Sequence, residues 1–342
     1  MAQTAPADVA ALVVEQFGGL VLGDVQTQSV FAQIATRYNM GAKQERLAVV
    51  DTLPTAGFVT AGAVDSTGQK PSGPVKYTAK DMTVATLAGI VTYSNEDIAD
   101  VTIDLLGNTR PLLSQKLAQV LDMATFFGNG KPAEWTEAGL DDGALAASQD
   151  SVIAASPATI VDAVAAAMQL LENKGMEPDV IVAKRGFRGA LRNLKLNTGA
   201  YLIGTDVTSG QPYDSLFGVP IKYMPWWDAA SKVVAFVCDS SGIIYGARQD
   251  VTFATSGEAV IGGISLFEYN RTALRAEMRA AFTTVQPVDP TGAKGYPVAT
   301  VSGATVAPFM PEGAEPEAQF VPTNAGDEGS QPAATTKSGN GK

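Results

Sequence analysis

The sequence contains few of the residue types that usually carry out chemistry. It has no histidine, which excludes Ser-His-Asp and Cys-His nucleophile pairs and every metal site that needs imidazole. Its single cysteine, Cys238, cannot form an internal disulfide or a thiolate cluster. Because Cys238 ends the apolar run 233–238, its position favours a small core residue in a buried strand over a reactive thiol.

Two further patterns resemble ligand sites but lack the required spacing. The run 128–131 (Gly-Asn-Gly-Lys) lacks the earlier glycine of a phosphate loop, and Pro132 stands where that loop needs Ser or Thr. Asp141 and Asp142 form a lone acidic pair among small residues, which favours solvated surface over a metal site. The sequence therefore predicts no catalytic residue, no metal and no cofactor.

Composition limits the class of protein further. The chain has 342 residues, 46% of them hydrophobic, which is enough for a sizeable core. Its 24 basic and 35 acidic residues give a net charge of −11, which argues against tight wrapping of duplex DNA. No apolar run reaches about 18 residues, and the first basic residue is Arg37, so we expect neither a membrane span nor a secretory signal. These features predict a soluble protein of a reducing cytoplasm.

The first 82 residues predict two segments that are marginal alone. Residues 1–28 predict an arm with a short helix, which is either an ordinary terminal helix or a segment that packs on a neighbouring subunit. After a strand at 46–50, residues 51–82 predict a long polar hairpin whose tip, 65–74, is rich in turn residues. Because the hairpin has too few apolar residues to fold against itself, we expect it to lie on another surface.

The middle of the chain predicts mixed helices and strands. A strand at 82–93 leads to Ser94, which caps a first helix ending near Leu106, and Pro111 opens a second helix that ends at Gly128. A loop at 131–150 follows. The remaining predicted elements are a helix at 157–174, a strand at 180–183, a basic helix at 186–195, a turn and strand at 216–221, and strands near 233–238, 242–247 and 251–255.

Strict alternation at 270–282 predicts a strand with one buried face. Its other face carries Arg275, Glu277 and Arg279, a row that can form ion pairs. Arg275 and Arg279 are also candidate subunit contacts. From residue 287 onward, proline and glycine reach about 29% (16 of 56 residues), which is typical of flexible chain.

Trp226 and Trp227 are adjacent in the sequence. Adjacent residues of a strand point to opposite faces, so one tryptophan is expected in the core and the other at a subunit contact, where tryptophan is enriched. The alternative is that both are partly buried packing residues.

The order of these segments resembles a tailed-bacteriophage major capsid protein of the Hong Kong 97-type fold, over roughly residues 29–288. No single motif is diagnostic, and the resemblance lies in order and spacing together. The segments that carry it are Phe31–Arg37, the strand at Leu47–Val49, the long hairpin, Val91–Asp100, Leu117–Gly128, the helix at 157–174, Pro178–Val182, Leu216–Ile221 and Leu274–Arg279.

The resemblance implies an α+β fold with five parts. An N-terminal arm (1–28) precedes the first part of a peripheral domain (29–135), which contains an extended β-hairpin loop (51–82) and a long spine helix (108–128). An axial domain (136–244) follows, then the return strands of the peripheral domain (245–288) and a flexible C-terminal tail (289–342).

The implied function is structural and not enzymatic. Many copies would pack as hexamers and pentamers into an icosahedral phage head enclosing double-stranded DNA, without sequence-specific binding, and would be located in the virion after assembly in the host cytoplasm. Because no large scaffolding segment precedes residue 29, we expect a separate scaffolding protein or none, together with a portal and a decoration protein. The alternative is an encapsulin-like nanocompartment shell that encloses cargo enzymes.

Some members of this family join neighbouring subunits by a Lys–Asn isopeptide bond promoted by a glutamate. Asn270 and Glu277 match the spacing of that region, and Lys70 at the hairpin tip is the expected nucleophile, with Lys76 and Lys80 as alternatives. The opposing interpretation is that Glu277 only pairs with Arg275 or Arg279, that Asn270 only begins a strand, and that Lys70 is solvated.

Overall fold

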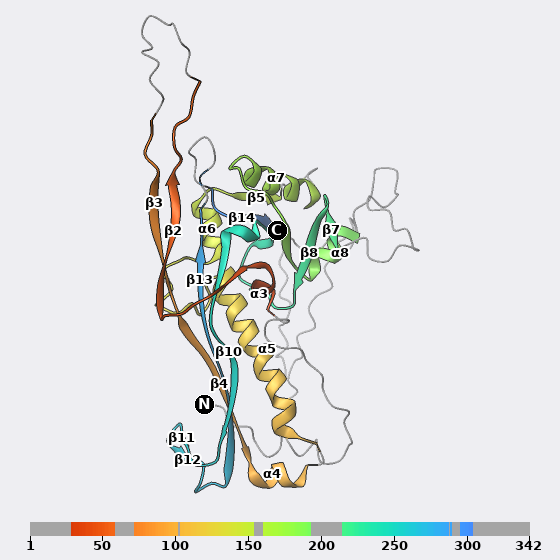
Figure 1. The fold of residues 1–342 in the computed structure, drawn as a ribbon. Coiled ribbons are helices and arrows are strands. Elements are labelled where there is room, and N and C mark those ends of the chain that lie inside the picture. The colour runs from red at the N-terminus through yellow and green to blue at the C-terminus, as the bar shows by residue number, and fades with distance from the viewer. Residues whose placement is uncertain are drawn as a thin grey trace, which may run out of the picture. The chain divides into compact units, whose positions relative to one another are not determined.

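The computed structural model describes residues 29–58, 72–101, 103–153, 160–192, 214–286, 288 and 295–303. All of them belong to one structural unit, Met1–Thr305, which combines two main sheets with helices (Figure 1). The predicted arm (1–28), Lys70 and most of the hairpin tip lie outside the described residues, as does the segment 304–342. No helix in the described part of the chain is both long and apolar enough to cross a membrane.

The first sheet has four strands in the order β1-β10-β13-β4. These are β1 (Thr36–Asn39), β10 (Ile243–Ser256), β13 (Arg271–Thr284) and β4 (Ala85–Ser94). β1 is parallel to β10, and the other neighbours are antiparallel. β13 confirms the strand predicted from alternation. The strands predicted at 242–247 and 251–255 are one continuous strand, β10, whose register shifts between Ala247 and Thr252 interrupt the pattern.

A long helix, α5 (Leu105–Phe126), covers one face of this sheet. The long helix predicted over 108–128 is present with shifted bounds. The first helix ends at Asp100 and not near Leu106, and the predicted helix start at Pro111 is wrong, because Pro111 lies inside α5. A proline there removes one backbone hydrogen bond. Burial of Leu113, Leu117 and Leu121 against the sheet offsets that loss.

Short elements surround this unit. Ser94 caps α4 (Asn95–Asp100) as predicted, because its side chain accepts a hydrogen bond from Glu96 N. The predicted loop at 131–150 is wrong in part, since it contains α6 (Leu140–Ala146) and the first residue of β5. The other short elements are α3 (Val30–Ile34), β11 (Val260–Ile261), β12 (Ile264–Ser265) and a 3-10 turn at Ser240–Gly242.

The second sheet has six strands in the order β5-β14-β9-β6-β8-β7. Their bounds are Asp150–Ile153, Val298–Gly303, Val233–Cys238, Val180–Lys184, Val219–Met224 and Ser215–Leu216. α7 (Ile160–Glu172) and α8 (Gly186–Arg192) pack on one face, and the other face belongs to the core that contains α5. Burial on both faces explains why β9 reads as a continuous apolar run that ends at the fully buried Cys238.

β14 corrects the prediction of a flexible tail over 289–342. Val298, Ala299 and Val301 are fully buried, and the strand lies between β5 and β9. Buried Gln149 fixes its start, accepting a hydrogen bond from Tyr296 N (2.8 Å) and donating to Tyr296 O (2.7 Å). The prediction used the glycine and proline content averaged over 56 residues. That average does not reveal the short β-forming run at 298–303.

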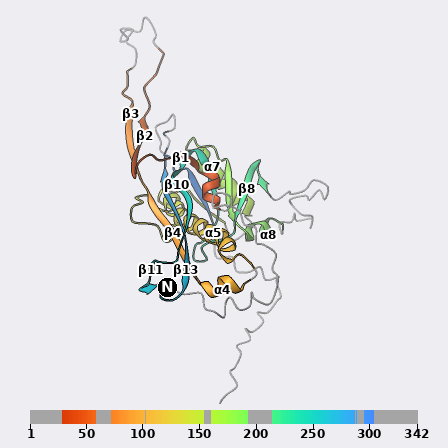
Figure 2. The same cartoon turned by 60° about the horizontal axis from the view of Figure 1, so that its bottom comes forward.

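A hairpin is present, but it begins earlier than the predicted range 51–82: its first strand is β2 (Gln44–Thr52), which pairs antiparallel with β3 (Lys76–Thr83). Figures 1 and 2 show both strands running beyond the two main sheets. The strand predicted at 46–50 lies within β2. The single strand predicted at 82–93 is divided at Val84 into the end of β3 and the start of β4.

Phe31 is the centre of an aromatic cluster that joins α3, α5 and the first sheet. Its ring makes edge-to-face contacts with Phe126, Tyr245 and Phe282 at centroid distances of 6.5, 5.7 and 5.5 Å. Phe126 in turn packs against Phe236 of the second sheet at 5.1 Å. One core therefore holds both sheets together.

Phe31→Ala should lower the free energy of unfolding by about 3–5 kcal/mol, because it leaves a cavity where four elements meet. Urea unfolding of the unassembled chain measures this loss. Phe267→Ala is the matched control, since that side chain is 80% exposed and its removal should change stability by less than about 0.5 kcal/mol. Equal effects of the two substitutions would contradict the central role of Phe31.

Candidate subunit-contact surfaces

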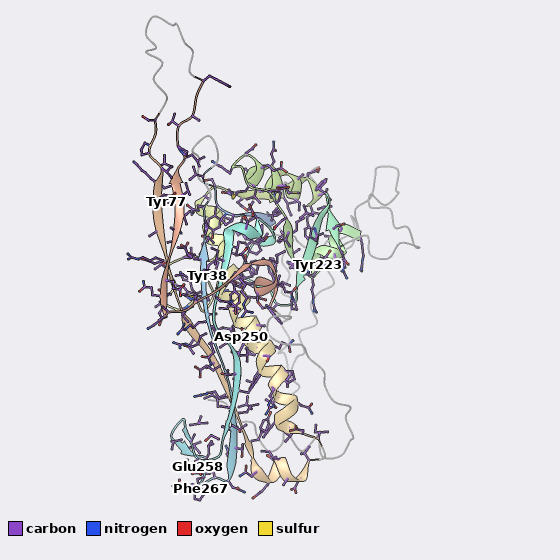
Figure 3. The ribbon with its side chains drawn as sticks, in the orientation of Figure 1. Tyr38, Tyr77, Tyr223, Asp250, Glu258 and Phe267 are labelled. Atoms are coloured by element: carbon purple, nitrogen blue, oxygen red, sulfur yellow. The ribbon has the colours of Figure 1, made fainter. Side chains whose placement is uncertain are left out.

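The β2–β3 hairpin exposes apolar side chains on a sheet of only two strands. A two-stranded hairpin is marginally stable in water, and exposed apolar patches mark contact sites. Figure 3 shows Tyr77 on this hairpin, away from the main sheets. The exposed large apolar residues of the hairpin are Val50, Leu53, Phe58, Val75 and Tyr77.

Ion pairs hold the base of the hairpin. Lys80 pairs with Glu137, and both side chains are largely buried. The hydroxyls of Thr283 and Thr284 approach the same carboxylate at 3.5 and 3.4 Å, which ties the hairpin to the end of β13. Lys80, one alternative nucleophile for a crosslink, is therefore engaged within its own chain.

The row on β13 forms one of its two expected ion pairs. Arg275 and Glu277 approach to 3.5 Å, and both side chains are partly exposed, so this pair stabilises by about 0–1 kcal/mol at most. The Nε of Arg279 is buried without a hydrogen-bond partner among the described residues. The row lies on the face of the sheet opposite Leu274, Ala276 and Met278, which pack in the core with α5.

Asn270 lies at the turn into β13 with a positive φ of 47°, a conformation that asparagine tolerates better than most residues. Its side-chain oxygen accepts a hydrogen bond from Asn95 Nδ2 at 2.7 Å. Its backbone oxygen accepts one from Asn95 N at 2.9 Å. Within one chain, Asn270 thus connects β13 to the start of α4.

The structure does not bring Asn270 and Glu277 together. At about 3.3 Å per residue along β13, they lie roughly 20 Å apart. Lys70, the expected nucleophile, lies outside the described residues. A covalent bond involving all three residue types therefore needs residues from more than one copy of the chain.

Both tryptophans lie in the loop after β8 and not on a strand. Trp226 Nε1 donates to Asp122 Oδ2 at 2.9 Å, and Trp227 Nε1 donates to the Val233 carbonyl at 2.9 Å. The Trp227 ring packs on Phe127 and Phe236. Both side chains are partly buried against the main core, so their intrachain contacts account for their positions, and a subunit contact stays a prediction.

Sequence reasoning missed Asp122, which lies fully buried on α5. Its carboxylate accepts four hydrogen bonds, from Ser29 Oγ (2.6 Å), Val30 N (3.1 Å), Phe31 N (3.1 Å) and Trp226 Nε1 (2.9 Å). Burial raises the pKa of Asp122 to about 6, although these donors favour the charged form. The sequence did contain a sign of this burial: Asp122 lies among apolar residues of the predicted helix, next to Leu121 and four residues before Phe126.

Comparison with known proteins identifies the family. Residues 10–290 match the phage capsid family. The chain belongs to the phage capsid family. A comparison with curated proteins gave no match.

Solved structures agree with this membership. A structure from Microbacterium phage Oxtober96 is 31% identical, with a TM-score of 0.73, covering 88% of this chain and 100% of the other. A structure from Mycobacterium phage Cain is 26% identical, with a TM-score of 0.75, covering 90% and 100%. At 16% identity, the capsid of an empty GTA particle shares the fold, with a TM-score of 0.57 over 89% and 99%.

This chain is therefore a tailed-phage major capsid protein with a mixed α+β fold, as the order of its segments predicted. It is a structural protein of the virion and assembles with copies of itself into a shell. The candidate contacts between copies are therefore the exposed β2–β3 hairpin and the row of Arg275, Glu277 and Arg279 on β13.

The raised pKa of Asp122 predicts a pH dependence of stability. Because the pKa of Asp122 is about 6 in the folded state and about 3.8 for an ordinary aspartate, the folded state binds a proton more tightly than the unfolded state does. The stability that this proton adds is lost as the pH rises from about 4 to above 6. Between pH 4 and pH 7 the wild type should lose about 3 kcal/mol of unfolding free energy relative to Asp122→Asn.

Urea unfolding of both proteins at the two pH values measures this difference. Asp100→Asn, at the exposed end of α4, is the matched control and should show no such divergence from the wild type. If the stabilities of wild type and Asp122→Asn run parallel across this pH range, the carboxylate does not titrate there.

Proposed function

We propose that the chain forms hexamers and pentamers that close into an icosahedral phage head around double-stranded DNA. The observation that carries this proposal is the β2–β3 hairpin, which exposes five large apolar side chains and forms a sheet of two strands with no third strand among the described residues. Such a hairpin gains stability when it packs on a neighbouring copy of the chain. In a closed shell every copy has such a neighbour.

In this proposal the two sheets correspond to the two domains of the Hong Kong 97-type fold. The four-stranded sheet with α5 is the peripheral domain, built from residues 29–135 and 245–288. The six-stranded sheet is the axial domain, to which β14 must be added beyond the range 136–244. The hairpin is the extended loop, and residues 1–28 are the arm.

The proposed partners follow from the charge and the function. A net charge of −11 favours loose enclosure of DNA over tight binding, because like charges repel at close range. A scaffolding protein, a portal and a decoration protein complete the assembly, which takes place in the host cytoplasm. Tight, salt-sensitive binding of DNA by purified empty shells would contradict loose enclosure.

Electron microscopy of the purified chain, expressed alone and with its neighbouring genes, tests the proposal. We expect capsomer-like rings or closed shells in at least one condition. Tyr77→Asp should reduce their yield at least tenfold by placing a charge in the hairpin contact, whereas Phe267→Asp, a matched exposed aromatic on another loop, should reduce it less. A monodisperse monomer in both conditions would overturn the proposal.

The contents of the particles distinguish the two kinds of shell. Nuclease-protected DNA after co-expression with the packaging genes supports a phage head. Protein cargo without DNA supports the encapsulin-like alternative, which would also form small shells without a scaffold.

A covalent bond between subunits stays a prediction from the resemblance, with Lys70, Asn270 and Glu277 as its residues. The hydrogen bonds of Asn270 to Asn95 and the ion pair of Glu277 with Arg275 support the noncovalent interpretation. Boiled, denatured mature particles that run only as monomer on a gel would establish that interpretation. A ladder of multimers that Asn270→Asp or Lys70→Arg abolishes would establish the bond.

A further inference from the structure

One edge of the six-stranded sheet is hollowed and acidic. A hollow of about 520 Å³ lies beside the edge strand β5, and its lining includes Asp141, Asp142 and Asp150 against one lysine, Lys232. Burial, followed by the charges of Asp142 and Asp228, raises the pKa of Asp141 to about 6, so a cation would be favourable there. Two apolar side chains on the lining, Leu145 and Val152, are 63% and 61% exposed.

The opposite edge of the same sheet carries an exposed aromatic residue. β7 and β8 are joined by a two-residue turn, Phe217-Gly218, in which both φ angles are positive (53° and 83°). Such turns favour Asn or Gly at the first position, and a bulky residue is unfavourable in this backbone conformation. Phe217 nevertheless occupies it and is 57% exposed, which indicates a role outside its own chain.

Guanidinium groups lie at the same edge of the sheet as this turn, where Arg188 contacts β8 and the residue that precedes β7. Residues 184–192 contain four cations and no carboxylate. Arg185 directly precedes α8, and Arg188 and Arg192 follow on the helix four residues apart, which places those two on one side of it. The Arg188 guanidinium stacks over the ring of Tyr223 on β8 at 4.5 Å and pairs with Asp214, and Figure 3 shows Tyr223 at this side of the sheet.

We propose that the Phe217 turn and the arginine side of α8 in one copy dock on the hollow beside β5 in the next copy. The aromatic ring would contact Leu145 and Val152, and the guanidinium groups would face Asp141 and Asp142. Both surfaces join an exposed apolar element to charges of opposite sign, and each is complementary to the other and not to itself.

The positions of the two surfaces make this contact head-to-tail. β5 and β7 are the two end strands of one sheet, so every copy offers one surface of each kind. Repetition of a head-to-tail contact closes a ring when the rotation between copies permits it. The inference rests on the proposed function and names the residues through which the sheets of neighbouring copies would meet.

Thiol crosslinking tests the pairing, because Cys238 is fully buried and leaves no reactive thiol on the described surface. Leu145→Cys and Phe217→Cys would be made singly and together and treated, as assembled particles, with a short bis-maleimide. The double variant should give a ladder of covalent multimers. Each single variant should stay monomeric, and a co-assembled mixture of the two should give dimers only.

A second variant distinguishes an effect on the contact between copies from an effect on the stability of the single chain. Phe217→Asn suits the positive φ of the turn, so the unassembled chain should unfold at an equal or higher urea concentration while ring formation falls at least tenfold. A merely structural role of Phe217 predicts no loss of assembly from this substitution.

The possible failures are distinguishable. If the wild type forms no rings or shells, the proposed function fails and this contact fails with it. If the wild type assembles but the double cysteine variant stays monomeric, or if either single variant crosslinks to itself, only the head-to-tail pairing is overturned. Normal assembly of Phe217→Asn would likewise overturn the role of the aromatic turn.

Discussion

The buried carboxylate of Asp122 is the constraint on which the rest of this architecture depends. A charge removed from water must be met by hydrogen-bond donors. Here the donors come from two separate segments, residues 29–31 and the loop after β8, and they meet at Asp122 on α5. Once the start of α3 is fixed, Phe31 is placed against Phe126, Tyr245 and Phe282. One polar anchor therefore determines how the aromatic core closes over both sheets.

Strands could be predicted from the sequence where the pattern of apolar residues shows which side chains are buried. Alternation predicted β13, and the continuous apolar run predicted β9 with Cys238 inside. Prediction failed where a distant contact outweighed a local signal. Pro111 indicates a helix start, yet α5 begins earlier, at Leu105, where Asp104 caps the helix and Leu105 is buried against Val101. β14 was concealed because its partners, β5 and β9, lie more than 60 residues away in the chain.

The candidate contact surfaces were predictable to different degrees. The hairpin was recognisable because its sequence lacks the apolar residues for a core of its own. The row of Arg275, Glu277 and Arg279 was visible as a period of two, but which charges pair depends on side-chain geometry. A turn at 216–218 was predicted, but the burial of Asp122 and the positive φ of Phe217 were missed, because both are properties of the folded chain that residue order alone does not report.

The position of β14 has a consequence for synthesis on the ribosome. This strand is the last described element to be translated, yet β5 pairs with nothing in its sheet except β14. A nascent chain that has not yet released residues 298–303 therefore lacks a completed second sheet and the hollow beside it. Polysomes hold many unfinished copies close together, and in each of them the hollow beside β5 is completed only after residues 298–303 have left the ribosome.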